Sequence, residues 1–136
     1  MKKPTLDHIG IAVRSLDEAT IWEELGLTVE HSENVETQGV RTAFLSVGDS
    51  NIELLEPTGE DSPVGRFIEK RGEGVHHICL RVERIEPYLE RLTEKGYRLV
   101  NDAPVPGAHG CRVVFLHPSA GRGVLIELSE KVDSDD

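Results

Sequence analysis

The stretch Leu6-Asp7-His8-Ile9-Gly10-Ile11-Ala12-Val13 has a counterpart later in the chain, Val75-His76-His77-Ile78-Cys79-Leu80-Arg81-Val82. In both stretches apolar side chains alternate with other residues, which is the period of a β-strand. Three further matches follow in the same order: Gly26 with Gly96, residues 41–45 with 112–116, and 52–54 with 126–128. The spacing between matching residues widens along the chain. The sequence therefore predicts two copies of one unit, with short insertions in the loops of the second.

Each copy is expected to contain one strand, one helix and three further strands. The first copy is predicted to have a strand over 6–13, a helix near 16–25 that starts at Ser15, and strands near 27–34, 39–47 and 50–56. The second is predicted to have a strand over 75–82, a helix near 85–95, and strands near 97–103, 111–116 and 123–130. The predicted fold class is α+β, with two βαβββ modules in one chain that enclose a cleft and carry their helices outside.

The expected organisation is a single domain over residues 1–136. Its repeats span about 5–57 and 74–130, joined by a linker over 58–73 with a short helix, and an acidic tail follows at 131–136. The formal net charge of −10 argues against nucleic acid and anionic membranes as partners. The start of the chain has no apolar segment of a signal peptide, and no apolar run approaches the ~20 residues of a membrane span. With only two cysteines, we expect a cytoplasmic chain with reduced thiols.

Four residues recur in pairs at equivalent places of the two copies. His8 and His77 lie on the strand face opposite the apolar one, and Glu53 and Glu127 interrupt apolar strands. A buried carboxylate is costly without a partner or a metal ion. If a pseudo-two-fold axis relates the copies, two imidazoles and two carboxylates converge. This donor set suits Co(II), Mn(II), Zn(II), Ni(II) or Fe(II) better than Ca(II), and the predicted cleft is therefore a metal-binding cleft.

The remaining histidines and cysteines are interpreted mainly as structural. Because neighbouring strand residues point to opposite faces, His76 faces away from His77. Cys79 shares the face of His77 and is expected to pack there rather than bind metal. Cys111, His31 and His117 are assigned structural roles. The interpretation of His109 stays open between a turn and a substrate contact.

These features resemble the vicinal oxygen chelate superfamily, the glyoxalase and bleomycin resistance fold. Within it, the likeness is greatest to the methylmalonyl-CoA epimerases. The likeness runs from about residue 5 to 130 and is carried by segments 7–13, 52–57, 74–80, 107–110, 115–118 and 123–128. The histidine motif of the first strand is common to the superfamily. The loop Gly107-Ala108-His109-Gly110 and the following Phe115-Leu116-His117-Pro118 are more particular to the epimerases.

The resemblance implies a metal-assisted isomerase. His8, Glu53, His77 and Glu127 would hold a divalent ion, with Co(II) first and Mn(II), Zn(II) or Ni(II) as alternatives. The reaction would remove and return the C2 proton of (R)/(S)-methylmalonyl-CoA through an enolate, with Glu127 as the catalytic acid–base group. Some bacterial members carry a glutamate base at the position of Thr42, which cannot act as a base. The second group therefore stays open between the 38–42 segment and a metal-bound water.

The expected partner is a small-molecule CoA thioester, and a homodimer is expected by analogy. Candidate substrate-binding residues are Gln38, Thr42, His109, Gly110 and Arg122. Because the chain is acidic, local positive charge must attract the substrate, and Arg112, Arg122 and Lys70 are the candidates besides the metal.

Three other functions use the same fold. A glyoxalase I-type lactoylglutathione lyase would use a similar ligand set, and the loop motifs argue weakly against it. An extradiol dioxygenase would need two histidines and one carboxylate on Fe(II), and the fourth ligand argues against it. A non-catalytic drug-binding protein has no reason to keep four ligands in register. The site rather than the fold must decide among them.

Overall fold

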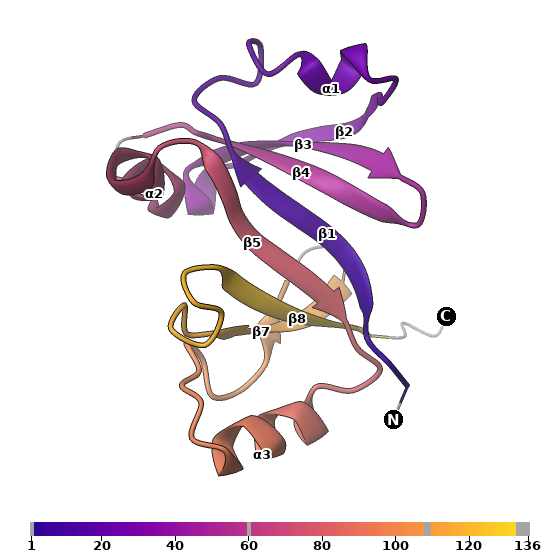
Figure 1. The fold of residues 1–136 in the computed structure, drawn as a ribbon, viewed down its shortest axis with the longest axis vertical. Helices are drawn as coiled ribbons and strands as arrows, with labels where there is room; N and C mark the ends of the chain where they lie inside the picture. Colours follow the sequence, from indigo (N-terminus) through magenta and orange to yellow (C-terminus); the bar gives the residue numbers. More distant parts are fainter. Residues whose placement is uncertain (1, 60, 108–109, 133–136) are drawn as a thin grey trace. The chain divides into compact units, whose positions relative to one another are not determined.

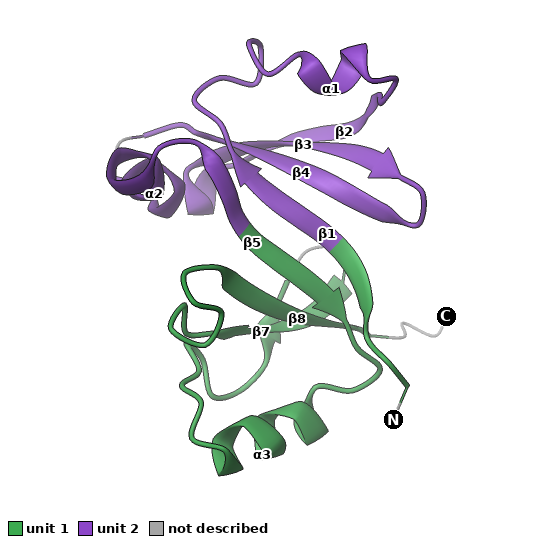
Figure 2. Cartoon of the chain, in the orientation of Figure 1, with its two compact units in different colours: residues 1–7, 77–136 green, residues 8–76 purple. Residues whose placement is uncertain are grey.

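The computed structural model describes residues 2–59, 61–107 and 110–132. The chain divides into two compact units, residues 1–7 with 77–136 (unit 1) and residues 8–76 (unit 2) (Figure 2). Within the described residues, every helix is too short and polar to cross a membrane. The two units are described separately below.

Unit 2 carries the first βαβββ module (Figure 1). Its elements are β1 (Thr5–Ala12), whose first three residues belong to unit 1, α1 (Ile21–Glu24), β2 (Val29–Val35), a 3-10 helix (Glu36–Gln38), β3 (Val40–Val47), β4 (Ser50–Pro57) and the linker helix α2 (Pro63–Arg71). The strand order is β2-β3-β4-β1. Strand β1 runs parallel to β4, and the β2–β3 and β3–β4 pairs are antiparallel.

Unit 1 repeats this arrangement with the second module. Its elements are β5 (Gly74–Arg81), whose first three residues belong to unit 2, α3 (Glu86–Glu94), β6 (Val105–Pro106), β7 (Cys111–Leu116) and β8 (Leu125–Lys131). The strand order is β5-β8-β7-β6, again with one parallel pair, β5 with β8. The predicted fold class, two βαβββ modules in one α+β chain, is confirmed.

Apolar side chains occupy both faces of the unit 2 sheet. On one face Val13, Ala43, Leu45 and Leu54 are buried and pack against side chains from β1 and the α1 region, including Trp22. The opposite face is covered by α2, and its buried cluster is Ala12, Val40, Leu55, Val64 and Ile68. Helix α2 begins at the N-cap Ser62, whose hydroxyl oxygen accepts a hydrogen bond from the Gly65 amide at 3.0 Å. The linker helix thus covers one end of the face that carries the candidate ligand Glu53.

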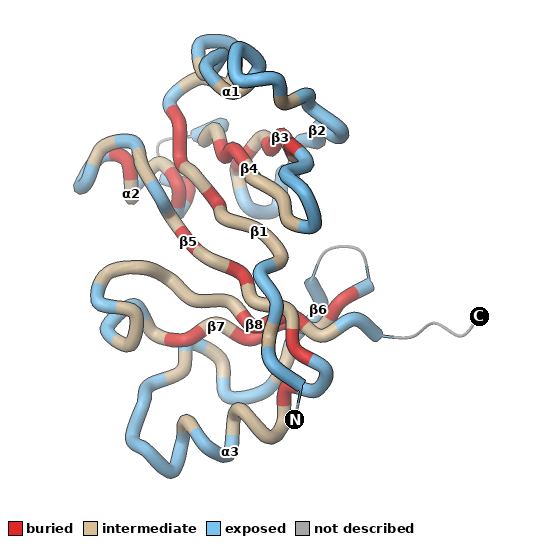
Figure 3. Tube along the Cα trace, turned by 45° about the vertical axis from the view of Figure 1, so that its right-hand side comes forward, coloured by how far each residue is buried: buried red, intermediate tan, exposed pale blue. Residues whose placement is uncertain are grey.

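The core of unit 1 lies between its sheet and α3. Its buried members are Val82, Ile85, Val114, Leu116 and Leu128. Figure 3 shows buried stretches along β7 and β8 in unit 1 and along β3 and β4 in unit 2. Helix α3 therefore covers the face of β5 that carries Leu80 and Val82, as the alternating pattern predicts.

Two predicted elements differ from the structure. The helix expected over 16–25 is reduced to α1, with Thr20 instead of Ser15 at its N-cap. The segment before it forms a turn, and the Leu16 amide donates a hydrogen bond to Glu56 Oε1 at 3.1 Å. This long-range contact satisfies an amide that would have no intrahelical partner at the start of the longer helix.

The strand expected over 97–103 is also absent as a continuous element. Only an isolated bridge between Leu99 and Leu116 occurs there, and the short strand β6 follows. The Asn101 side chain takes the place of a backbone partner, since its Oδ1 accepts the Phe115 amide hydrogen bond at 2.9 Å. Asn side chains commonly compete with sheet ladders in this way.

Candidate metal and proton-transfer site

In unit 2 the parallel pairing of β1 and β4 brings His8 to Glu53. The register places Gly10 opposite Glu53, so His8 lies two residues before the position that faces the carboxylate. His8 Nε2 and Glu53 Oε1 are 3.4 Å apart, and the two side chains are only 13% and 14% exposed. A carboxylate buried to this degree needs a partner or a cation. Two of the four predicted ligands, His8 and Glu53, therefore lie close together within unit 2.

In unit 1 the pairing of β5 and β8 builds the same arrangement. Cys79 faces Glu127, and His77 lies two residues before Cys79. His77 Nε2 and Glu127 Oε1 are 3.8 Å apart, with side-chain exposures of 10% and 14%. The same His–Glu pair thus occurs in both modules, because the parallel strands of each module are paired in the same register.

The donor chemistry of each pair fits a divalent metal ion. Each supplies one imidazole nitrogen and one carboxylate oxygen, both largely shielded from water. His77 and Glu127 belong to a group of side chains that could hold a metal ion. Nitrogen and oxygen donors of this kind suit Co(II), Mn(II), Ni(II) and Zn(II). The residues present are therefore compatible with the metal that the sequence predicts.

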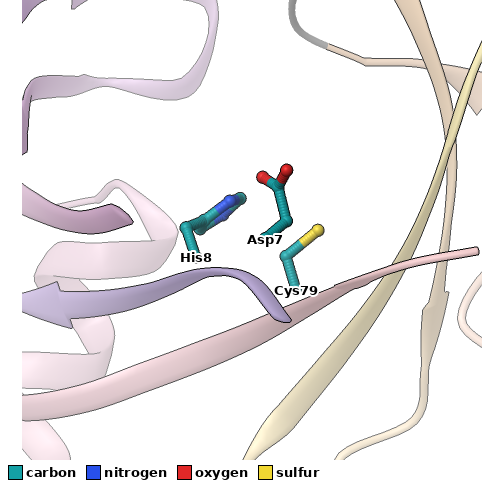
Figure 4. A group of neighbouring side chains, drawn as sticks. All are labelled: Asp7, His8 and Cys79. Carbon is teal, nitrogen blue, oxygen red and sulfur yellow. The ribbon is translucent and has the colours of Figure 1, made fainter. Parts of the chain in front are cut away.

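Cys79 modifies the surroundings of Glu127. The thiol is 1% exposed, and burial raises its pKa, an effect that the negative charges of Glu127 and Asp7 and a hydrogen bond to Glu127 reinforce. Figure 4 shows the Asp7 and Cys79 side chains projecting to the same side of the ribbon. A protonated thiol is a hydrogen-bond donor and a poor metal ligand. Cys79 also belongs to a group of side chains that could hold a metal ion, so its expected packing role stays a prediction.

An aromatic ring lies beside each glutamate and was not singled out from the sequence. Phe44 faces Glu53 across β3 and β4, and Phe115 faces Glu127 across β7 and β8. The Phe44 ring contacts His8 edge-on, with ring centroids 6.3 Å apart. The match of segments 41–45 and 112–116 already contained this signal, because both phenylalanines occupy the same repeat position.

The predicted substrate-binding residues are distributed over both units. In unit 2, Gln38 ends the 3-10 helix, and Thr42 is 3% exposed with its hydroxyl donating to the Glu33 carbonyl at 3.4 Å. In unit 1, Gly110 precedes β7 and Arg122 is exposed in the turn before β8. His109 lies outside the described residues. Of the four described residues, Gln38 and Thr42 belong to unit 2, and Gly110 and Arg122 belong to unit 1.

Arg112 does not fit the expected role in attracting substrate. Its Nη2 lies 2.7 Å from Glu130 Oε1 and 3.0 Å from Glu86 Oε2. The same Glu130 oxygen accepts a hydrogen bond from the Ile85 amide at 2.9 Å, next to the first residue of α3. The Arg112 guanidinium therefore links α3 to β8 through Glu86 and Glu130. These two carboxylates already neutralise its charge. Lys70 lies in the last turn of α2.

Comparison with known proteins places the chain in a family. The model of the Glyoxalase/Bleomycin resistance protein/Dioxygenase superfamily matches residues 7–115. The chain belongs to this superfamily, whose fold agrees with the paired modules described above.

Curated relatives and solved structures then define the branch. The chain is 40% identical to an ethylmalonyl-CoA/methylmalonyl-CoA epimerase of Cereibacter sphaeroides, over 92% of this chain and 96% of that protein. It is similar to a structure titled methylmalonyl-CoA epimerase in complex with methylmalonyl-CoA and NH4+, with 40% identity, 96% of each chain covered and a TM-score of 0.82. A hypothetical protein from Bacillus halodurans is 47% identical, with 99% of each chain covered and a TM-score of 0.89. Within the superfamily, the chain belongs to the methylmalonyl-CoA epimerase family, whose named members are isomerases.

Proposed function

We propose that this protein interconverts the (R) and (S) forms of methylmalonyl-CoA by removing and returning the proton at C2. The observation that carries the proposal is the repeated His–Glu pair, nearly buried and in the same register in both modules. Family membership supplies the substrate class, because a related structure is titled as a complex with methylmalonyl-CoA. Together they favour an isomerase that acts on a CoA thioester.

We also propose that His8, Glu53, His77 and Glu127 bind one divalent metal ion. Co(II) is the first choice, and Mn(II), Zn(II) and Ni(II) are alternatives. When bound, the ion would act as a Lewis acid toward negative charge that develops on the substrate oxygens. The support is the donor chemistry of the two pairs and the repeat that relates them.

Glu127 is the proposed proton carrier. Its carboxylate is 14% exposed, so few waters compete for the proton that it takes from C2. Proton removal leaves an enolate, and reprotonation on the other face of C2 inverts the centre. The thiol of Cys79 donates a hydrogen bond to Glu127 and helps to hold the carboxylate in place. Phe115 excludes water on the other side, because it faces Glu127 from β7.

The second acid–base group is not Thr42. Its hydroxyl is buried and directed at a backbone carbonyl, and it has no basic atom for proton abstraction. Thr42 lies opposite Leu55 on β4, two residues from Glu53. We propose that Thr42 shapes this face of unit 2, and that Gln38, His109, Gly110 and Arg122 contact substrate.

Hydrogen exchange at C2 tests the reaction directly. Cobalt-loaded protein is mixed with methylmalonyl-CoA in D₂O, and the C2 proton is followed by proton NMR. We expect rapid loss of that signal, abolished by EDTA and strongly slowed by the Glu127→Gln substitution. The matched control is Cys111→Ala, a buried thiol outside both His–Glu pairs. Absence of exchange in metal-loaded protein contradicts the epimerase proposal.

The alternatives give different results in the same assay series. Turnover of a glutathione hemithioacetal without C2 exchange of methylmalonyl-CoA would favour the glyoxalase I-type reaction. Tight binding of a drug without any turnover would favour a sequestering protein. We further propose a single-domain protein that works in the cytoplasm as a homodimer, which sedimentation equilibrium and cell fractionation would test.

A further inference from the structure

The boundary between unit 1 and unit 2 falls within strand β1, between Asp7 and His8. Asp7 is the last residue of the N-terminal part of unit 1, and His8 is the first residue of unit 2 (Figure 2). Both lie within β1, so no turn separates them. An extended backbone advances only ~3.3 Å per residue. Whatever holds Asp7 therefore restricts where the His8 backbone can lie.

An ion pair within unit 1 holds Asp7. Arg81 Nη2 lies 2.7 Å from Asp7 Oδ1, and the two side chains are 42% and 24% exposed. Arg81 ends β5 opposite the buried Ser129 of β8. The next amide, that of Val82, donates to the Ser129 carbonyl at 2.9 Å. Arg81, which binds Asp7, thus lies at the end of β5, and β5 is paired with β8, the strand that contains Glu127.

Arg81 keeps this position at a cost. The Nε atom of Arg81 is buried and has no hydrogen-bond partner among the described residues. A buried donor without a partner lowers stability, and native proteins keep few of them.

A second ion pair of the same segment provides a contrast. Lys2 Nζ and Glu83 Oε2 are 3.7 Å apart, and their side chains are 80% and 58% exposed. Exposed pairs of this kind contribute little, because water and salt screen them. Of these two pairs, only the one between Asp7 and Arg81 has the short, partly buried geometry needed to hold the strand.

We propose that Asp7 and Arg81 are positioning residues, whose ion pair holds the start of β1 on unit 1 and so fixes the backbone of the proposed metal ligand His8. This inference rests on the four-ligand site of the proposed function. The Asp7 carboxylate is also in a group of side chains that could hold a metal ion, but in this proposal it is held by Arg81 and is not assigned as a ligand. Both residues act through the backbone of His8, which follows Asp7 directly in the strand.

A positioning role and a purely electrostatic role predict different changes in metal affinity for the two substitutions. If only charge mattered, Asp7→Asn would weaken the binding of a cation and Arg81→Gln would strengthen it. If the pair positions His8, both substitutions weaken binding, because each releases the same strand. In that case the double variant binds about as well as either single variant.

The experiment titrates Co(II) into metal-free protein by calorimetry and by the visible absorption of the bound ion. We expect Asp7→Asn and Arg81→Gln each to weaken binding about tenfold, the scale of lost supporting contacts around metal ligands. The double variant should show the same loss. Asp7→Glu keeps the pair and should bind nearly as the unaltered protein does. The matched controls, Lys2→Gln and Glu83→Gln, should leave affinity unchanged.

Thermal unfolding of each metal-free variant separates misfolding from lost positioning. If Arg81→Gln does not fold, Arg81→Lys takes its place, since lysine keeps the charge without the planar fork. Changes of Co(II) affinity in opposite directions in the two single variants, or no change in either, would overturn this inference. The proposed metal site would still stand if the unaltered protein binds Co(II). Failure of the unaltered protein to bind Co(II) would overturn both proposals.

Discussion

The His8–Glu53 pair of unit 2 and the His77–Glu127 pair of unit 1 share a register and differ in one neighbour. The residue opposite Glu53 is Gly10, whereas the residue opposite Glu127 is Cys79. Gly10 offers no side chain, while the Cys79 thiol is buried and hydrogen-bonded to its glutamate. Repetition of the fold thus supplies two equivalent His–Glu pairs, whose glutamates have different neighbours. This difference supports Glu127 rather than Glu53 as the proton carrier.

The largest expected effect comes from removing either histidine. His8→Ala and His77→Ala should each weaken Co(II) binding by more than ~10²-fold, beyond the usual loss for supporting residues, and abolish C2 exchange. Calorimetry and NMR measure the two quantities, and circular dichroism checks the fold. A histidine variant with full metal affinity would show that its pair does not contribute to the site. His76→Ala is the matched control, because His76 contacts Phe67 of α2 instead.

Substitution of the two glutamates separates their roles. Glu127→Gln should lower the rate of C2 exchange by ~10²–10⁴-fold, the usual contribution of an acid–base group. Glu53→Gln keeps a ligand oxygen and should mainly weaken metal binding. Rates at saturating metal distinguish the two effects. Equal losses of rate in both variants would contradict the assignment of the base to one pair.

Gly10 faces Glu53 as Cys79 faces Glu127. Replacing Cys79 with glycine should have a smaller effect on the exchange rate than the substitutions above. Cys79→Gly removes the hydrogen bond to Glu127 and leaves a gap in a buried position, so both the exchange rate and the melting temperature should fall. Cys79→Ser keeps a donor and should retain more activity than Cys79→Gly. Should Cys79→Gly match the unaltered protein in rate, the thiol has no part in holding Glu127.

The Cys79 pKa also predicts how stability depends on pH. Burial raises this pKa in the folded protein, whereas the unfolded chain loses the proton near its ordinary value of ~8.5. The contribution is therefore complete below ~8.5 and is lost as pH rises above it. Melting of metal-free protein between neutral and alkaline pH should show this decline, and Cys79→Ala should reduce it. An identical decline in Cys79→Ala would assign it to other groups.

The smallest effect is expected for the arginines at the matching positions of β3 and β7. Arg112→Gln removes a cation shared by two carboxylates, one of which also accepts the Ile85 amide, and should lower the melting temperature slightly. Arg41→Gln loses a single longer contact to Glu56 and should have less effect. Added salt should shrink the difference, because it screens exposed charges. A larger loss for Arg41→Gln would contradict this ranking.

The two histidines and two glutamates could be singled out from the sequence because their selection depends on local period and repetition. Strand alternation places His8 and His77 opposite the apolar face, and the recurrence of Glu53 and Glu127 identifies their partners. Both inferences need only the order of residues along the strands. The register of the parallel strands then brings the predicted partners together in each unit.

Other features depend on contacts between distant parts of the chain. Nothing near Leu16 predicts that Glu56 binds its amide and that the following helix is short, and nothing near Arg112 predicts that Glu86 and Glu130 neutralise it. Such partners are separated by 18 to 40 residues, so no local pattern contains them.

The sequence by itself determined the two βαβββ modules, the faces of their strands and the histidine and glutamate of each pair, because periodicity and internal repetition are local properties. Only the tertiary structure decided which carboxylate receives the Cys79 hydrogen bond, how the Asn101 side chain replaces part of a strand, and that Arg81 holds Asp7. These outcomes depend on burial and on distances between side chains, which folding creates and the residue order alone does not specify.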